Sequence, residues 1–338
     1  MYWYYKYPLI IILIAFLFGC CVFAWRSCAS TYLSRSSEEE SEPVFVEDEA
    51  KAPKTPEIPA PPKAQAASDK PAPKPPSKPL KVEVLPENVT QTIKEAEEAL
   101  NADNPKHARE LAYTLLESGS CPEYSKAWFT VAGIIDRADK VFMSGKAPCA
   151  EKKNYTVVSG DSLDRIARKL NTTTGAIQRL NALKSTSDII HPGQLFQYID
   201  GTWSIKVSKT HYVLMLYLND KLYRIYRISI GKQDRTPIGL FVIKDKLMNP
   251  AWWTPSGESI PSNDPRNILG TRWMALQPIG ETDSTLKGYG IHGTTEPDTI
   301  GTASSQGCVR MLNDEVDELY DFIPVTYMKT PVYVTIEE

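Results

Sequence analysis

The sequence predicts a multidomain chain with a mainly β carboxy-terminal domain, a small mixed α and β module, a short helical region and an amino-terminal membrane helix. Uncharged apolar residues fill positions 7–25, and prolines crowd positions 36–86. Near residue 202 the apolar pattern changes from a helical period to β-rich runs. A chain of 338 residues has room for about two or three such domains.

The amino-terminal segment, residues 1–35, is predicted to enter a membrane. No charged residue occurs from Tyr7 to Trp25, and about 20 apolar residues span a bilayer. Trp25 and the aromatic run 2–5 fit interfacial anchors. A retained signal anchor is favoured, while lipidation after cleavage before Cys20 and a fully cleaved signal peptide stay open as alternatives.

Residues 36–86 are predicted to be a proline-rich linker. A charged, proline-rich stretch cannot bury enough apolar surface to fold, so it stays solvated and acts as a semi-rigid spacer. The net charge of the whole chain is −3, and nothing in it supports a nucleic-acid partner.

Residues 87–150 are predicted to be helical. Val89, Ile93, Ala96 and Leu100 repeat at a helical period, Asn104-Pro105 starts a second helix, and a third helix runs over 125–143. The region is weakly similar to tetratricopeptide repeats. A spacer role is favoured over a docking site for a protein partner.

The cysteines separate into structural and reactive candidates. Cys121 and Cys149 flank the third helix and could form a disulfide in an oxidising compartment. Cys308 would then stay unpaired. The chain has no Cys-x-x-Cys and no His-rich cluster, so neither a metal site nor a cofactor is predicted.

Residues 153–200 predict a strand, two helices and a strand. A turn with a helix cap separates the first strand from the first helix, and a second turn precedes the last strand. This segment resembles a LysM module, a small βααβ fold that binds N-acetylglucosamine-containing glycans. The resemblance implies glycan contacts in the turns and at the end of the second helix, at Gly160, Asp161, Ser162, Asn181, Pro192 and Gly193.

Residues 202–338 are predicted to form a twisted β-sandwich with one helix over about 313–323. Within this region His292 and Cys308 each stand beside a glycine. A cysteine needs a base to become a thiolate at neutral pH, and a histidine is the usual one. A buried structural cysteine with an unrelated histidine is the alternative for such a pair in isolation.

Four sequence blocks decide between these interpretations. In chain order they read Ser229-Ile230-Gly231-Lys232 with Arg235-Thr236-Pro237-Ile238-Gly239, Asn267-Ile268-Leu269-Gly270-Thr271-Arg272-Trp273, Ile291-His292-Gly293-Thr294, and Ser305-Gln306-Gly307-Cys308-Val309-Arg310-Met311. The region resembles an L,D-transpeptidase catalytic domain of the YkuD type. Gln306 departs from the pattern, since many members carry histidine there.

The resemblance implies that Cys308 is the nucleophile and His292 its general base. A backbone carbonyl is expected to orient the imidazole, because no carboxylate lies in the motif. The Gly307 and Cys308 N–H groups are expected to form the oxyanion hole, and Arg310 to hold a substrate carboxylate. Further substrate contacts are expected at Gly293, Thr294, Ser305 and Tyr289. Trp273 is expected in the core.

The implied activity is the formation of 3→3 cross-links in peptidoglycan through a cysteine thioester, with stem peptides and glycan as partners. Water as acceptor would instead give an L,D-carboxypeptidase. A catalytically silent wall-binding anchor is the rival from a different class. The expected location is the cell envelope, with the chain anchored in the inner membrane and its domains facing the periplasm and cell wall.

Overall fold

The computed structural model describes residues 85–144, 147–185, 189–254, 256–325 and 330–338, which all belong to one unit, Lys78–Glu338. The predicted membrane segment 1–35 and nearly all of the predicted linker 36–86 lie outside the described residues. Among the residues that are described, no helix combines the length and the apolar character needed to cross a membrane.

Three helices follow the linker: α2 (Glu87–Asn101), α3 (Pro105–Glu117) and α4 (Lys126–Met143). Asn104 caps α3 by accepting the His107 N–H, and Ser125 caps α4 in the same way. The helices bury small and branched side chains against one another. The same cluster also takes in Val213, Met215 and Leu222 from the neighbouring sheet.

The next segment forms a separate small core. Its elements are β1 (Lys152–Thr156), α5 (Leu163–Leu170), α6 (Thr174–Leu180) and β2 (Leu195–Ile199), and β1 pairs antiparallel with β2. Ser162 and Thr173 cap the two helices. Ile166, Ile177 and Phe196 are fully buried between the helices and the strand pair.

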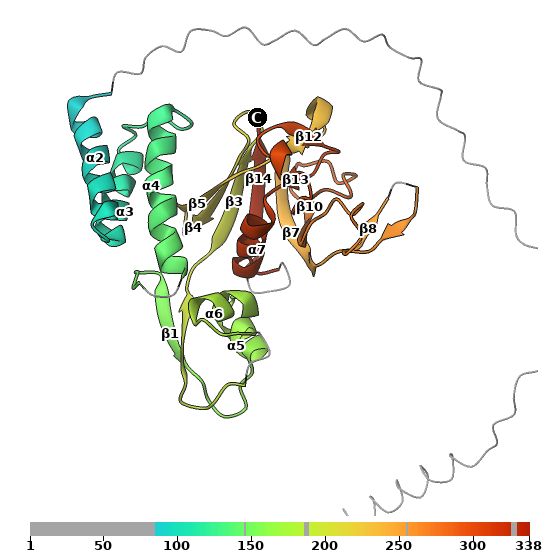
Figure 1. Cartoon of the computed structure of the whole chain (residues 1–338), viewed down its shortest axis with the longest axis horizontal. Coiled ribbons are helices and arrows are strands. Elements are labelled where there is room, and N and C mark those ends of the chain that lie inside the picture. Colours follow the sequence, from blue (N-terminus) through green and yellow to red (C-terminus); the bar gives the residue numbers. More distant parts are fainter. Residues whose placement is uncertain (1–84, 145–146, 186–188, 255, 326–329) are drawn as a thin grey trace, which may run out of the picture. The chain divides into compact units, whose positions relative to one another are not determined.

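One mixed sheet of eight strands dominates the rest of the described chain (Figure 1). Its order is β13 (Val309–Arg310), β11 (Gly290–His292), β10 (Arg272–Pro278), β7 (Gly239–Met248), β14 (Tyr333–Glu337), β3 (Trp203–Ser208), β4 (Val213–Leu218) and β5 (Lys221–Arg227). Short pairs join β6 (Ile230–Gly231) to β12 (Ala303–Ser305) and β8 (Trp252–Trp253) to β9 (Ser259–Ile260). The remaining elements are α7 (Asn313–Phe322) and the short helices η1 (Lys232–Asp234) and η2 (Pro297–Thr299).

The sheet curls so that its two edges meet. Ser229, just after β5, exchanges two backbone hydrogen bonds of 2.9 Å with Arg310 in β13 at the opposite edge. Leu214 from β4 and Ile291 from β11 share one core with α7. The prediction of a mainly β domain is confirmed. The two layers expected of a sandwich are two halves of one curled sheet.

The helical region is not a detached spacer. Strand β4 is apolar on both faces because Leu214 and Leu216 point into the sheet's core while Val213 and Met215 pack against the helices. Burial on both faces explains its continuous apolar sequence.

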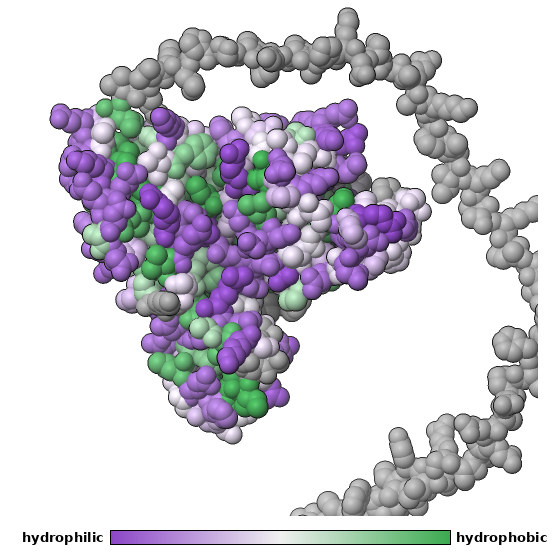
Figure 2. Space-filling view, in the orientation of Figure 1, coloured by the Kyte–Doolittle hydropathy of each residue, from purple (hydrophilic) through white to green (hydrophobic). Residues whose placement is uncertain are grey.

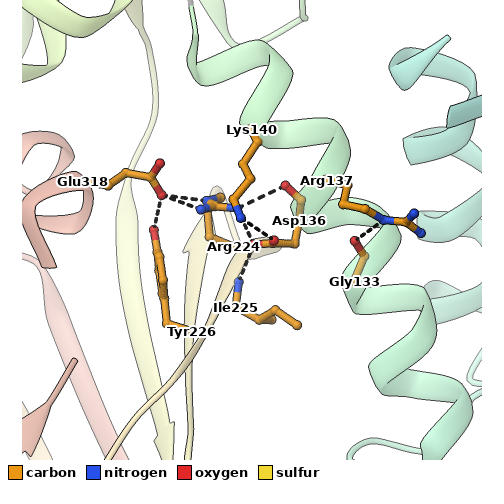
Figure 3. A network of polar contacts seen from close by, with 8 residues as sticks. All are labelled: Gly133, Asp136, Arg137, Lys140, Arg224, Ile225, Tyr226 and Glu318. Carbon is orange, nitrogen blue, oxygen red and sulfur yellow. Dashed lines mark hydrogen bonds and ion pairs between the residues drawn. The ribbon is translucent and has the colours of Figure 1, made fainter. Parts of the chain in front are cut away.

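A buried arginine reinforces this contact (Figure 3). Arg224 in β5 is 2% exposed and donates to Asp136 in α4 and to Glu318 in α7, with its Nη2 2.6 Å from Glu318 Oε1. Tyr226 donates to the same carboxylate at 2.9 Å. One guanidinium therefore connects the helical region, the sheet and α7.

The possible disulfide between Cys121 and Cys149 is absent from the described structure. Cys121 is buried in the helical core, whereas Cys149 lies near Glu151 at the start of the small module. The two thiols occupy different environments, so flanking the same helix does not bring them together.

Candidate active site

Strand pairing brings the predicted cysteine and histidine to one face of the sheet. Strands β11 and β13 are parallel, with Ile291 opposite Val309 and His292 opposite Arg310. Side chains alternate along a strand, and Ile291 and Val309 point into the core. Cys308, directly before β13, therefore faces the same side as His292.

His292 is held as a neutral imidazole. Its ring is buried, and Nδ1 donates to the Gly293 carbonyl at 2.7 Å, which confirms the expectation that a backbone carbonyl orients it. Burial lowers the pKa of His292 to about 4; hydrogen bonds to the Gly293 and Leu269 backbone oppose this shift and the Arg310 charge adds to it. With Nδ1 carrying the proton, Nε2 is the nitrogen that can accept one.

Cys308 rests as a thiol. Sγ donates to the Gly288 carbonyl at 3.6 Å. Burial raises the pKa of the Cys308 thiol to about 11, against the opposing effects of the Gly290 backbone and the Arg310 charge. Both groups of the pair are therefore uncharged at neutral pH.

The turn before Cys308 is fixed by neighbouring hydroxyl groups. Ser305 Oγ donates to the Cys308 carbonyl at 2.6 Å and accepts the Gly307 N–H at 3.0 Å. Thr236 Oγ1 donates to the Gly307 carbonyl at 2.9 Å. The prediction that Gly307 supplies an oxyanion N–H is not supported, because Ser305 takes that donor; Ser305 itself shapes the turn.

Cys308 and His292 line one cavity of about 510 Å³. Its wall also holds Leu247, Pro250, Ala251, Trp252, Trp253, Ile268, Leu269, Trp273, Gly288, Ser305, Gln306 and Arg310. Trp273 was expected in the core. Instead it is partly exposed at the cavity, where its ring stacks on His292 with the centroids 5.6 Å apart. Gln306 accepts a hydrogen bond from Arg235 at 3.3 Å.

Arg310 is the cationic group of the cavity. It is 5% exposed, and its Nη1 lies 2.9 Å from Glu296 Oε2, while its Nε has no hydrogen-bond partner among the described residues. The side chain of Glu296 is itself 59% exposed. A buried guanidinium with an unsatisfied N–H can bind an anionic group that enters the cavity.

Three predicted substrate contacts do not line the cavity. Tyr289 packs against the core, with its ring edge 2.9 Å from where a Cβ on Gly307 would stand. Thr294 is buried, and its backbone binds the side chain of Asn313. Gly293 contributes its carbonyl to His292 rather than to an open surface. These three residues belong to the family motif and its flank, and in the structure they shape the backbone around His292 and Cys308.

Three of the six predicted glycan contacts stabilise the small module itself. Asp161 accepts from Tyr155 and from the Val158 N–H, Ser162 caps α5, and the Asn181 amide ties α6 to Gln197 in β2. Gly160 and Gly193 form turns at positive φ, and Pro192 is exposed. Of these six positions, Gly160, Pro192 and Gly193 remain as surface candidates.

Exposed apolar side chains offer a different surface on this module. Val158, Ile189 and Leu195 are 52%, 83% and 58% exposed. Figure 2 shows hydrophobic residues at the surface of the same module. Such side chains can contact the apolar faces of sugar rings. They were not among the predicted glycan contacts, which were turn and polar residues. Within the described residues, no cluster of three or more His, Cys, Asp or Glu side chains could hold a metal ion.

Comparisons with known proteins agree with this geometry. The L,D-transpeptidase catalytic domain family (YkuD) matches residues 202–334, and the LysM domain family matches residues 155–197. The putative L,D-transpeptidase YqjB of Bacillus subtilis (strain 168) is 38% identical over 120 residues, which cover 35% of this chain and 65% of that protein. The putative L,D-transpeptidase YkuD of the same strain is 32% identical over 176 residues, which cover 50% of this chain and 93% of that protein.

Among solved structures, the catalytic domain of the E. faecium L,D-transpeptidase is 21% identical, with a TM-score of 0.29 over 40% of this chain and 98% of that one. The family assignment rests on the sequence relatives, since YkuD is matched over nearly its whole length. Three of the four motif blocks line one cavity, and Thr236 of the remaining block hydrogen-bonds to Gly307 beside it. The chain belongs to the L,D-transpeptidase family and carries a LysM module before its catalytic domain.

Proposed function

We propose that this chain forms 3→3 cross-links between peptidoglycan stem peptides through a thioester on Cys308. The observation that carries the proposal is the shared face of Cys308 and His292 on paired strands, above one cavity that also holds the buried Arg310. A thiol, a neutral imidazole and a cation are the groups that acyl transfer to and from an acidic peptide requires.

In the acylation step the thiol turns from Gly288 toward His292 Nε2, which takes its proton. Sγ attacks the carbonyl carbon between the third and fourth residues of a tetrapeptide stem. The Cys308 N–H stabilises the oxyanion that develops. The C–N bond breaks, His292 returns the proton to the departing amine, and D-Ala leaves. Arg310 holds a substrate carboxylate, in exchange for Glu296.

In the second step an amine of another stem attacks the thioester. His292 accepts a proton from this amine and returns it to Sγ as the C–S bond breaks. The neutral imidazole is suited to both transfers because it is a base before each attack and an acid after it. Water in place of the amine would give a tripeptide and make the protein a carboxypeptidase.

We further propose that the LysM module binds peptidoglycan glycan through Val158, Ile189 and Leu195 with the adjacent turns, and that the apolar segment 7–25 anchors the chain in the inner membrane with its domains in the periplasm. Fractionation of cells that express the full chain tests the anchor. Release by salt or carbonate washing would contradict it.

The activity is tested with full-length protein in detergent and purified disaccharide-tetrapeptide, followed by mass spectrometry. Released D-Ala and a cross-linked dimer are expected, and both are absent in Cys308→Ala. Tripeptide without dimer would identify a carboxypeptidase. Retained binding to sacculi without any turnover would leave a wall anchor as the function.

A further inference from the structure

The side-chain amide of Asn313, the first residue of α7, forms hydrogen bonds with two other segments of the chain. Its Oδ1 accepts the Thr271 N–H at 3.3 Å and the Thr294 N–H at 3.1 Å, and its Nδ2 donates to the Thr294 carbonyl at 2.9 Å. One amide therefore holds both polar groups of the Thr294 backbone and connects them to the start of β10.

This arrangement is not a helix cap. A capping asparagine accepts an N–H from its own helix, whereas Asn313 accepts none from α7. The cap position is Leu312, which makes no side-chain capping bond. The helix is fixed independently, since Asp317 accepts from Thr271 Oγ1 and Glu318 pairs with Arg224. The amide of Asn313 is thus presented from a rigid element.

Two glycines make room for this amide. A Cβ on Gly293 would lie 2.2 Å from Asn313 Oδ1, and a Cβ on Gly270, which has a φ of +65°, would lie 2.3 Å from it. Both distances are far shorter than the non-bonded carbon–oxygen distances found in proteins. The close approach of Asn313 Oδ1 therefore requires a glycine at position 293, and no substrate contact is needed to account for this residue.

The hydrogen bonds of Asn313 fix the Gly293 carbonyl, which is the group that orients His292. The Gly293 N–H donates to the Arg272 carbonyl at 3.2 Å, and the following residue, Thr294, is held by Asn313 on both sides. The peptide plane between Gly293 and Thr294 is therefore held through its N–H by Asn313. Its carbonyl consequently stays 2.7 Å from His292 Nδ1.

We infer that Asn313 is a positioning residue that holds the Gly293 carbonyl against His292 Nδ1, so that the proton stays on Nδ1 and Nε2 serves as the base. The value of this role for catalysis rests on the proposed function. The tautomer itself is a property of the free protein and can be measured without any substrate.

The test is nitrogen NMR of the imidazoles in full-length protein, with the His292 signal assigned by its loss in His292→Gln. Wild type should show His292 protonated at Nδ1. Asn313→Ala should show a mixture of both tautomers. Asn313→Asp loses the bond to the Thr294 carbonyl but keeps an oxygen for both N–H groups, which include the N–H of the Gly293–Thr294 peptide, so it should keep the wild-type tautomer. If the alanine variant does not fold, Asn313→Ser replaces it, because serine is too short to reach both N–H groups.

A matched control separates positioning from general stability. Asn219 packs against Gly201 and accepts the Thr202 N–H at 2.9 Å, at a positive φ that glycine tolerates. Asn219→Gly should lower the melting temperature without changing the His292 tautomer. A wild-type tautomer in Asn313→Ala, or in Asn313→Ser where the alanine variant does not fold, would overturn the inference.

A carbapenem is expected to acylate Cys308, because its strained lactam carbonyl is open to attack by the thiol. The rate of this acylation measures the catalytic consequence. Asn313→Ala should lower it by about 10- to 100-fold, as loss of an outer partner of a functional histidine does, while Asn313→Asp should restore most of the rate. A wild-type protein that neither acylates nor releases D-Ala would remove the proposed function, and the NMR result would still decide the role of Asn313.

Discussion

Trp273 and His292 are register partners on neighbouring antiparallel strands, and their rings stack with centroids 5.6 Å apart and planes at 28°. The indole covers one face of the imidazole at the cavity. Gly290, two residues before His292, leaves the space that the indole occupies, since a Cβ there would lie 2.6 Å from the ring. This stacking contributes to the burial that keeps His292 neutral.

Replacement of Trp273 should therefore change the pH dependence. Burial lowers the pKa of His292 to about 4, so Trp273→Ala, which admits water, should raise that pKa toward its usual value of about 6.5. The protonated imidazole is no base, and the carbapenem acylation rate at pH 5 should fall much more than at pH 8. Trp253→Ala, which removes a 70% exposed ring from the same cavity, should leave the acidic limb in place.

The resting pair should react with a broad pH plateau. Because the pKa of His292 is lowered to about 4 and that of Cys308 is raised to about 11, the acylation rate should stay flat between these values and fall below the lower one. In His292→Ala the rate should instead rise about tenfold per pH unit, following the thiolate. Strong thiolate absorbance at pH 7, present in wild type and lost in Cys308→Ala, would contradict this description.

Glu296 should act as an internal competitor for the substrate carboxylate. It pairs with the buried Arg310 but is itself 59% exposed, so the pair is expected to contribute little to stability. Glu296→Gln should lower the KM for tetrapeptide by about two- to fivefold with kcat unchanged. Arg310→Met should raise KM strongly. An unchanged KM in both variants would show that Arg310 does not bind substrate.

Arg224 should be essential to the folded unit. Its removal leaves the partly buried Glu318 without its cation and leaves Asp136 with only the exposed Lys140. Arg224→Met should lower the free energy of unfolding in urea by about 3–5 kcal/mol. Lys221→Met, which breaks an exposed pair with Glu117, should cost less than about 1 kcal/mol. Similar losses in the two variants would show that the network is not specific.

The sequence predicted the site where the chemistry depends on residue type. A nucleophilic Cys308 needs a base close to its thiol, and His292 was the candidate in the motif. Because the motif holds no carboxylate, a backbone carbonyl was the expected partner of the imidazole. Predictions failed where a polar residue had two possible uses. Asn181 and Ser305 bind their own backbone neighbours, and only the three-dimensional turn shows this.

Packing between distant segments was the other source of error. Trp273 lies in a strand, where an aromatic residue usually indicates core, but the curl of the sheet places it at the cavity. The docking of the helices had a signal that was overlooked. The continuous apolar run of β4 indicates a strand covered on both faces, so a second layer had to lie outside it.

The most direct test of the central claim is the intact mass of the full-length protein, quenched with acid during turnover of a stem tetrapeptide. A tripeptide adduct, in thioester linkage to Cys308, is predicted in wild type and should be absent in Cys308→Ala. Release of D-Ala by the Cys308→Ala variant, or an adduct mapped to any residue other than Cys308, would contradict the account.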